Sequence, residues 1–366
     1  MIIDVHCHVG LSARRVDSNL TRFSFEADGA SGTPGYDSYL SPRLLARPAW
    51  FFVRRWLKID PRLDRGEALD RQIEAVNERH WSAATGVDRF VLLAFDEYHD
   101  VHGRVVGSAS RGQRFGSDLF ASNTLVRAMC ADRPDRFLFG ASIHPYRRGA
   151  CEMLEEAAAA GAVLVKWLPI HHNIRAEDPR TVDFLRRAAA LHIPMLIHYG
   201  GEMSLSRQHM EFEDPRPMLS VLRNLRREDA MPAVIVAHAA TPSFFWQSRT
   251  GCLVFLDALI GEFADAPLYA DISALAAFGR TGWLRKLAQR RELHRKLLWG
   301  SDYPIPVITS AFRRQIDRAT RREIAAHPSW VEQSLRVAKA LGYDDCVFTQ
   351  ASELLCRKQA HGSMQK

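Results

Sequence analysis

The sequence lacks both a long apolar run and closely spaced cysteines. A membrane-spanning helix needs about 20 consecutive apolar residues, and no stretch comes near that length. The cysteines at positions 7, 130, 151, 252, 346 and 356 form no CxxC pair, so neither a zinc finger nor a disulfide framework is predicted. We expect these cysteines to be small buried side chains in a reducing compartment.

The N-terminus also lacks the basic leader and cleavage site of a signal peptide, so we expect a cytoplasmic protein without membrane association. The formal charge of +7 could indicate a nucleic-acid partner. However, the basic residues gather in runs at 285–296 and 313–322, which are typical of solvated helix faces and have no interleaved aromatic residues to stack on bases. We therefore expect a small-molecule substrate and no nucleic acid.

Eight short apolar segments alternate with amphipathic segments of helical period along the 366 residues. Continuous apolar strands joined by helical crossovers are typical of a parallel sheet that is covered on both faces. Eight such units predict an α/β fold, a closed (β/α)8 TIM barrel, formed by residues 1–366 as a single domain. The predicted strands are 2–6, 90–94, 137–141, 163–167, 194–198, 234–238, 268–271 and 297–302. The predicted helices are 67–85, 118–132, 150–160, 179–191, 215–227, 252–264 and 280–293, with extra C-terminal helices at 311–326 and 330–341 and a tail to 366.

A long insertion, residues 10–66, follows the first predicted strand. It is rich in Gly, Pro, Ser and Arg at first and becomes aromatic around Trp50-Phe51-Phe52-Val53 and Trp56. Loops of this length are usually functional or carry extra elements. We favour a helix packed on the barrel wall for the aromatic part; a cap over the site and a homodimer contact are the alternatives.

The motif Asp4-Val5-His6-Cys7-His8 ends the first strand, where His6 and His8 point to the same face. Two imidazoles at this spacing can bind one metal ion. In a (β/α)8 barrel the reactive residues lie at the C-terminal ends of the strands. Those ends also carry further metal-competent or charged residues, namely Lys166, His198, His238 and Asp302.

With these residues in view, the chain resembles the amidohydrolase superfamily of metal-dependent barrel enzymes. The nearest branch is the amidohydrolase 2 group, which includes aminocarboxymuconate-semialdehyde decarboxylase and related decarboxylases. The resemblance spans essentially the whole chain and rests on Asp4-Val5-His6-Cys7-His8, Ile197-His198, Ala237-His238 and Trp299-Gly300-Ser301-Asp302-Tyr303-Pro304. It implies that His6, His8, His198 and Asp302 hold one zinc-like divalent ion. His238 would contact the water or the substrate rather than the metal.

This ligand set agrees with elementary chemistry. Three imidazoles and a carboxylate suit zinc with an open position, and the metal lowers the pKa of a bound water to ~7. Asp302 can take the proton of this water as a general base, and His238 can polarise a carbonyl. Lys166 could bridge two metals as a carboxylated lysine, as in some members of the superfamily, or bind a substrate carboxylate or phosphate as a plain ammonium.

Loops expected at the same mouth carry further candidates for substrate binding. Tyr and Arg side chains there could hold an anionic substrate, although such loop residues are often only solvated. The candidates are His144, His171, His172, Tyr199, Glu202 and Arg249. Asp271 and Ser273 end the seventh strand and either line the pocket or serve as structural hydrogen-bonding groups.

The sequence thus predicts a metal-dependent hydrolase in which an activated water attacks the carbonyl of an amide, ester or lactone in a small anionic substrate. One alternative is a metal-dependent non-oxidative decarboxylase of an aromatic or unsaturated carboxylic acid, because the ligand set serves both reactions. An alternative of another class is a barrel that only binds a ligand; the intact ligand set argues against it.

Overall fold

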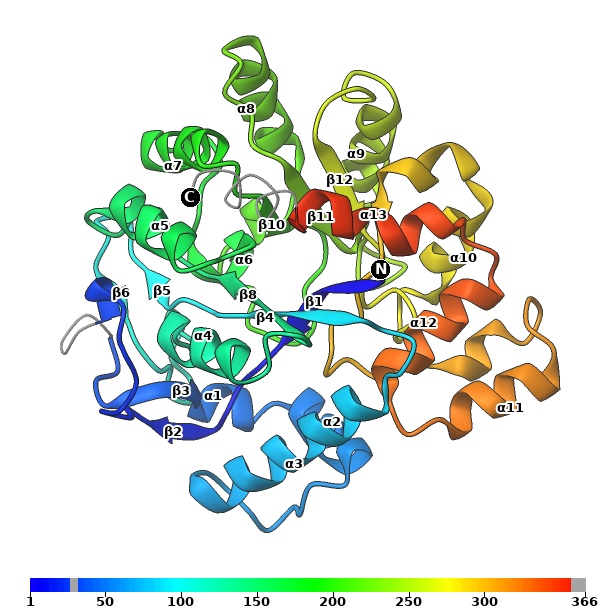
Figure 1. The fold of residues 1–366 in the computed structure, drawn as a ribbon, viewed down its shortest axis with the longest axis horizontal. Helices are drawn as coiled ribbons and strands as arrows, with labels where there is room; N and C mark the ends of the chain where they lie inside the picture. Colours follow the sequence, from blue (N-terminus) through cyan, green and yellow to red (C-terminus); the bar gives the residue numbers. More distant parts are fainter. Residues whose placement is uncertain (27–31, 357–366) are drawn as a thin grey trace.

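The computed structural model describes residues 1–26 and 32–356 and contains a parallel eight-stranded sheet curled around a central axis (Figure 1). The strand order follows the chain, which confirms the predicted (β/α)8 architecture. The strands are β1 (Ile3–His8), β4 (Arg89–Leu93), β8 (Phe137–Ala141), β9 (Leu164–Trp167), β10 (Met195–His198), β11 (Val234–Ala237), β12 (Leu268–Asp271) and β13 (Leu297–Leu298).

The barrel is closed by the segment that follows β13 rather than by β13 itself. The Asp302 backbone N–H donates to the His6 carbonyl at 2.8 Å, and the His8 N–H donates to the Tyr303 carbonyl at 2.9 Å. A parallel bridge between Cys7 and Tyr303 completes this contact. The last and first strand segments therefore meet where the predicted site residues lie.

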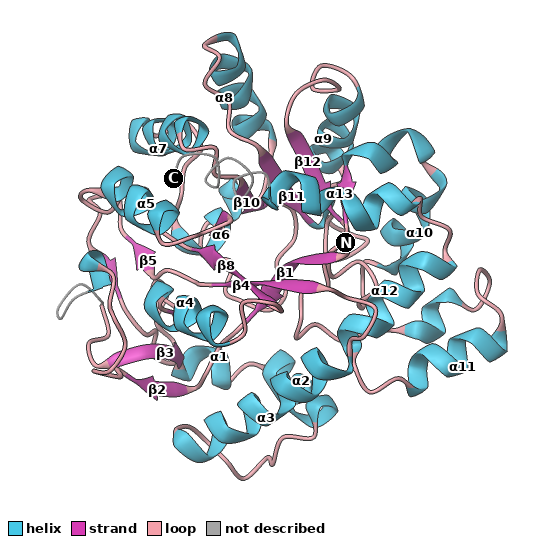
Figure 2. Cartoon of the chain, in the orientation of Figure 1, coloured by secondary structure: helices cyan, strands magenta, loops and turns pink. Residues whose placement is uncertain are grey.

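Helices cover the outside of the sheet, as amphipathic crossovers require (Figure 2). They are α3 (Glu67–Ala83), α4 (Asn123–Asp132), α5 (Ala150–Ala159), α7 (Pro179–Ala190), α8 (Arg216–Arg227), α9 (Thr250–Ile260), α10 (Thr281–Gln289), α11 (Arg318–Ala326), α12 (Trp330–Ala340) and α13 (Asp345–Cys356). Inward-facing strand residues such as Val5, Val91 and Leu196 form a separate apolar cluster with Ala351 and Leu355 of α13. Helix α13 thus closes the end of the barrel opposite the site. The rest of the predicted tail, 357–366, lies outside the described residues.

The structure corrects some predicted boundaries. The helix predicted at 118–132 begins only at Asn123, because β7 (Leu119–Ala121) pairs antiparallel with β3 (Tyr36–Leu40) of the insertion. The Ser122 hydroxyl accepts the Leu125 N–H and so fixes the true start of α4. The helix predicted at 311–326 is a short 3-10 turn followed by α11, whose N-cap is Asp317.

The insertion forms a small unit at the barrel mouth. It contains β2 (Ala13–Arg15), β3, α1 (Pro42–Leu45) and α2 (Pro48–Leu57), while the later hairpin of β5 (Tyr98–His99) and β6 (Val105–Val106) and the short helix α6 (Pro169–His172) lie in loops between strands. Trp50 and Val53 of α2 line a cavity, whereas Phe51 and Phe52 are 58% and 53% exposed. One face of α2, with Trp50, covers the cavity, while Phe51 and Phe52 point to solvent; this differs from the packing on the barrel wall favoured from the sequence.

Over residues 1–26 and 32–356, none of the helices has the length and apolarity that a membrane crossing requires. The cysteines within these residues are all free thiols, and Cys7, Cys130 and Cys252 are buried.

Candidate metal centre

His6, His8 and Asp302 converge at the C-terminal end of the barrel. The Nε2 atoms of His6 and His8 lie 3.1 Å apart. The Asp302 Oδ1 atom lies 3.3 Å from His6 Nε2 and 3.2 Å from His8 Nε2. Three ligand-type atoms therefore share one small space, as the sequence predicts for these residues.

His238 joins this cluster from the 3-10 turn that directly follows β11. Its Nε2 lies 3.7 Å from Asp302 Oδ2, and ligand atoms of His6, His238 and Asp302 all lie within 4.8 Å of one another. His198 lies beside it, with ring centroids 4.8 Å apart, but His198 Nε2 is 3.3 Å from the Gly201 carbonyl and 3.6 Å from Glu202. Of these two imidazoles, His238 is the one whose ligand atom lies with those of His6 and Asp302, whereas His198 contacts the ring of His238.

Asp271 and Ser273 lie behind the cluster and orient its histidines. His6 Nδ1 donates to Asp271 Oδ2 at 2.9 Å, and His238 Nδ1 donates to the Ser273 carbonyl at 2.8 Å. Each contact fixes the proton on Nδ1 and leaves Nε2 with a free lone pair toward Asp302. Of the two roles open from the sequence, these residues are hydrogen-bonding supports rather than cavity lining.

The protonation states suit a metal-binding site. Burial, reinforced by the nearby Lys166, lowers the pKa of His6 well below its ordinary value. Burial likewise lowers the pKa values of His198 and His238, so these imidazoles are neutral near pH 7. Burial alone would raise the pKa of Asp302, but His6 and His8 lower it below its ordinary value, so Asp302 is a carboxylate. Neutral imidazole and ionised carboxylate are the forms that bind cations.

Lys166, the second-last residue of β9, reaches the same cluster. Its Nζ lies 3.0 Å from His6 Nε2, and the side chain is buried. Burial lowers its pKa to about 8, although Asp302 and Asp271 act in the opposite direction. Lys166 therefore lies at the site, where its strand-end position in the sequence predicts it, and its amine points at His6.

The local backbone is held in an uncommon conformation at two of these residues. Asp302 has a φ of 57° and His238 a φ of 52°, both in the left-handed region that non-glycine residues rarely adopt. Such conformations persist where the surrounding structure fixes them, often at functional sites. Gly300 lets the chain pass this point, because a Cβ there would lie 3.0 Å from His6 Cβ.

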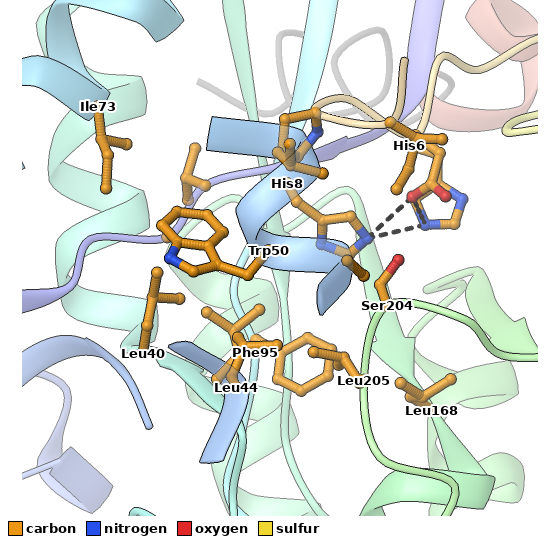
Figure 3. A pocket seen from close by; sticks show the side chains of 18 of the residues that line it. His6, His8, Leu40, Leu44, Trp50, Ile73, Phe95, Leu168, Ser204 and Leu205 are labelled. Carbon is orange, nitrogen blue, oxygen red and sulfur yellow. Dashed lines mark hydrogen bonds and ion pairs between the residues drawn. The ribbon is translucent and has the colours of Figure 1, made fainter. Parts of the chain in front are cut away.

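A cavity of about 180 Å³ opens from the cluster toward the insertion (Figure 3). His6 and His8 lie at one end, whereas Trp50, Leu44 and Ile73 lie on the other side, as Figure 3 shows. Most lining residues are apolar. The lining comprises His6, His8, Val9, Gly10, Leu40, Leu44, Ala49, Trp50, Val53, Leu57, Ile59, Ile73, Val76, Asn77, Phe95, Leu119, Lys166, Leu168, His198, Glu202, Ser204, Leu205, His238, Asp302, Pro304 and Ile305.

Several candidates for substrate binding lie outside this lining. Arg249 is exposed at the start of α9, and Tyr199 is buried in the main core. Tyr199 follows His198 directly, so strand alternation turns it away from the site. His144 and His172 are buried behind Phe95, where His144 Nε2 donates to the His172 carbonyl at 2.8 Å.

His171 is buried with its Nε2 accepting the Asp118 N–H, whereas Glu202 does line the cavity. The cavity therefore gives little support to the anionic substrate predicted from the sequence, since neither Tyr199 nor Arg249 reaches it.

Sequence reasoning missed the apolar wall and one buried cation. Leu40, Leu44 and Ile73 carry no signal that separates cavity lining from ordinary core. Arg280 is buried behind the site and donates to the Gly201 carbonyl and to Ser243 Oγ, the latter at 3.2 Å. In the sequence Arg280 looks like a surface residue at a helix start, so no local pattern could have identified it.

Comparisons with known proteins agree with this fold. An uncharacterized TIM-barrel protein from Bordetella bronchiseptica matches with 15% identity, coverage of 99% of this chain and 98% of its own, and a TM-score of 0.54. An amidohydrolase from Burkholderia multivorans with bound zinc matches with 12% identity, coverage of 97% and 99%, and a TM-score of 0.52. At these identities the two structures show the shared fold.

A probable 2-pyrone-4,6-dicarboxylic acid hydrolase from Acinetobacter baumannii matches with 15% identity, 97% and 99% coverage and a TM-score of 0.49. No curated protein matches the sequence. The amidohydrolase family model matches residues 3–335, nearly the whole chain. The chain therefore belongs to the amidohydrolase family of metal-dependent TIM-barrel enzymes and is an enzyme of the amidohydrolase superfamily.

Proposed function

We propose that this enzyme is a metal-dependent hydrolase that cleaves a small ester, amide or lactone at its carbonyl. The observation that carries the proposal is the position of Asp302. Its carboxylate lies within 3.3 Å of two imidazoles and 3.7 Å from a third, at the inner end of a mainly apolar cavity. A carboxylate placed this way can bind a cation and accept a proton from water.

His6, His8, His198 and Asp302 would hold a single divalent ion, for which zinc is the best match. The fit rests on the donor chemistry, because neutral nitrogens and one carboxylate oxygen are typical zinc ligands. It also rests on Asp271, which fixes the His6 proton on Nδ1 and leaves Nε2 free to bind. When bound, the ion would supply an acidified water at neutral pH and polarise the carbonyl.

Asp302 and His238 would then have separate roles in the reaction. Asp302 would accept the proton of the attacking water and pass it to the leaving group. His238 Nε2, with its lone pair directed into the site, would accept a hydrogen bond from the attacking water and orient it. Asp302 and His238 are thus the catalytic residues of the proposal, and the apolar lining would limit access of bulk water.

Decarboxylation is the second candidate, and Lys166 is the observation that favours it. An ammonium 3.0 Å from His6 could bind the carboxylate of an aromatic acid beside the metal. Against this reading, Lys166 is the single Lys or Arg among the described residues that line the cavity. A neutral carbonyl compound needs no further counter-charge, so hydrolysis is the better match.

The test combines metal analysis with two substrate panels. Purified wild-type enzyme should contain about one equivalent of zinc, and His198→Ala should lose it. His238→Ala should retain the metal but lose roughly 10²- to 10⁴-fold in turnover. The zinc-loaded enzyme should hydrolyse members of an ester, amide and lactone panel and release no carbon dioxide from a panel of aromatic carboxylic acids.

Turnover confined to the carboxylic acids would overturn the proposal in favour of decarboxylation. Two equivalents of metal would instead assign Lys166 a bridging role. Loss of metal in His238→Ala but not in His198→Ala would exchange the roles of these two histidines.

A further inference from the structure

The far part of the cavity is built by the insertion and by α3. Leu40 ends β3, Leu44 lies in α1, Trp50 and Val53 lie in α2, and Ile73 lies in α3. Leu40, Leu44, Trp50 and Ile73 line the same cavity as His6 and His8 (Figure 3). Protein cores normally pack without voids, because a void lined by Leu and Ile destabilises the fold. An open apolar space connected to a metal-binding cluster is therefore a binding site.

The charge of the lining limits what can occupy this space. Lys166 is the single Lys or Arg among the described lining residues, and it lies at the inner end, 3.0 Å from His6. The acidic lining residues, Glu202 and Asp302, belong to that inner end as well, since Glu202 lies 3.6 Å from His198. A charged group among Leu44, Val53 and Ile73 would be buried without a partner, which is strongly unfavourable.

The size of the cavity sets the length of the occupant. A cavity of about 150 Å³ lined by Leu, Ile and Phe is known to bind benzene, so about 180 Å³ holds roughly one ring or a short alkyl chain beside the reacting group.

We infer that the substrate is a neutral carbonyl compound with an apolar substituent, an aryl ring or an alkyl chain of roughly four to seven carbons. The substituent lies between α2 and α3, and the carbonyl lies at the histidine cluster. This inference rests on the proposed function for the reaction and adds the class of substrate. It replaces the anionic substrate expected from the sequence.

The first experiment measures binding without chemistry. Straight-chain methyl ketones from four to ten carbons are titrated into the zinc-loaded enzyme by calorimetry, next to analogues that carry a carboxylate at the far end of the chain. Affinity should rise about fourfold per methylene until the cavity is full and then level off. The carboxylated analogues should bind at least tenfold more weakly than the ketones of the same length.

Two substitutions at Val53 and one matched control test whether the alkyl chain of the ketone lies in the cavity. Val53→Phe should move the length limit to shorter ketones, and Val53→Ala should move it to longer ones. Phe52→Leu, on the exposed face of the same helix, should leave the limit unchanged. Opposite shifts at one position cannot arise from a general loss of folding.

Hydrolysis of esters with the same range of chain lengths separates this inference from the proposed function. A chain-length trend in ketone binding without ester hydrolysis would support the apolar site and overturn the reaction. Hydrolysis with affinities that are independent of chain length, or tighter binding of the carboxylated analogues, would overturn the inference alone.

Discussion

His6 shows how the chemistry of one residue depends on a neighbour far along the chain. Its Nδ1 donates to Asp271, 265 positions away, and this contact decides which ring nitrogen can bind a cation. The sequence predicted His6 as a ligand from its spacing to His8, but it left the role of Asp271 open. A carboxylate at a strand end can line a pocket or support a ligand, and only the three-dimensional contact distinguishes the two.

Asp271→Asn should weaken zinc binding about 10- to 100-fold. An amide would turn an N–H toward His6 Nδ1, which favours the opposite tautomer and places a proton on the nitrogen that should bind the metal. Competition with a chelator measures the affinity. Ser273→Ala keeps the carboxylate and should change the affinity only a few-fold; an equal loss in both variants would contradict the argument.

At the scale of elements, the ends of β4 and β8 are joined by a buried ion pair. Asp96 accepts from Arg147 Nε at 2.8 Å and from the His144 N–H at 2.6 Å, and it is 4% exposed. Burial alone would raise the pKa of Asp96, but the Arg147 guanidinium lowers it well below the ordinary value. The pair thus fixes the loops behind Phe95, which lines the cavity.

This pair predicts a defined dependence of stability on pH. Because the folded pKa of Asp96 lies below the unfolded value of about 3.9, its contribution is complete above that value and is lost as the pH falls toward the folded pKa. Asp96→Asn should lower the free energy of unfolding by roughly 3–5 kcal/mol at pH 7. Urea unfolding between pH 7 and pH 3 should also show that the free energy of unfolding falls less with decreasing pH in this variant than in the wild type.

Asp183→Asn, at an exposed pair with Arg186 on α7, is the control and should change little. If the free energy of unfolding of Asp96→Asn fell with pH as steeply as that of the wild type, other carboxylates would be responsible for the loss of stability in acid.

The strands and crossover helices were largely predictable, because buried parallel strands are continuous apolar runs and helices carry a regular apolar face. The exceptions have physical causes. Residues 119–121 were read as helix, yet they pair with β3 about 80 residues earlier, which local periodicity cannot reveal. The last strand was read as 297–302, but only Leu297–Leu298 stays in the sheet, and Ser301 instead donates its N–H and its hydroxyl to Asp4.

The site residues were predictable to the extent that their residue type signals chemistry. His6, His8, His238 and Asp302 converge as their strand-end positions indicated, whereas the assignment of His198 rather than His238 as a metal ligand stays a prediction. In the sequence, side chains that shape the cavity, such as Leu44 and Val53, cannot be distinguished from core residues. Their role follows from the position of the insertion at the barrel mouth, which local sequence patterns do not show.

For the whole molecule, metal binding should couple to global stability, because the proposed ligands come from strands throughout the barrel. Zinc at 100 times its dissociation constant should add about 2.7 kcal/mol to the free energy of unfolding. Urea unfolding with zinc and with excess chelator measures this difference. His8→Ala should lose the zinc-dependent gain; a gain of wild-type size in this variant would exclude His8 as a ligand.

The contact that joins the two ends of the circular sheet also has a practical meaning. Asp302 donates its backbone N–H to His6, so the residue pair that completes the ring belongs to the proposed catalytic centre. Loosening of this junction would disable turnover while the remaining strands stay paired. Enzymatic rate is therefore a sensitive gauge of local fraying, and during gentle denaturation it should decline before bulk spectroscopic signals change.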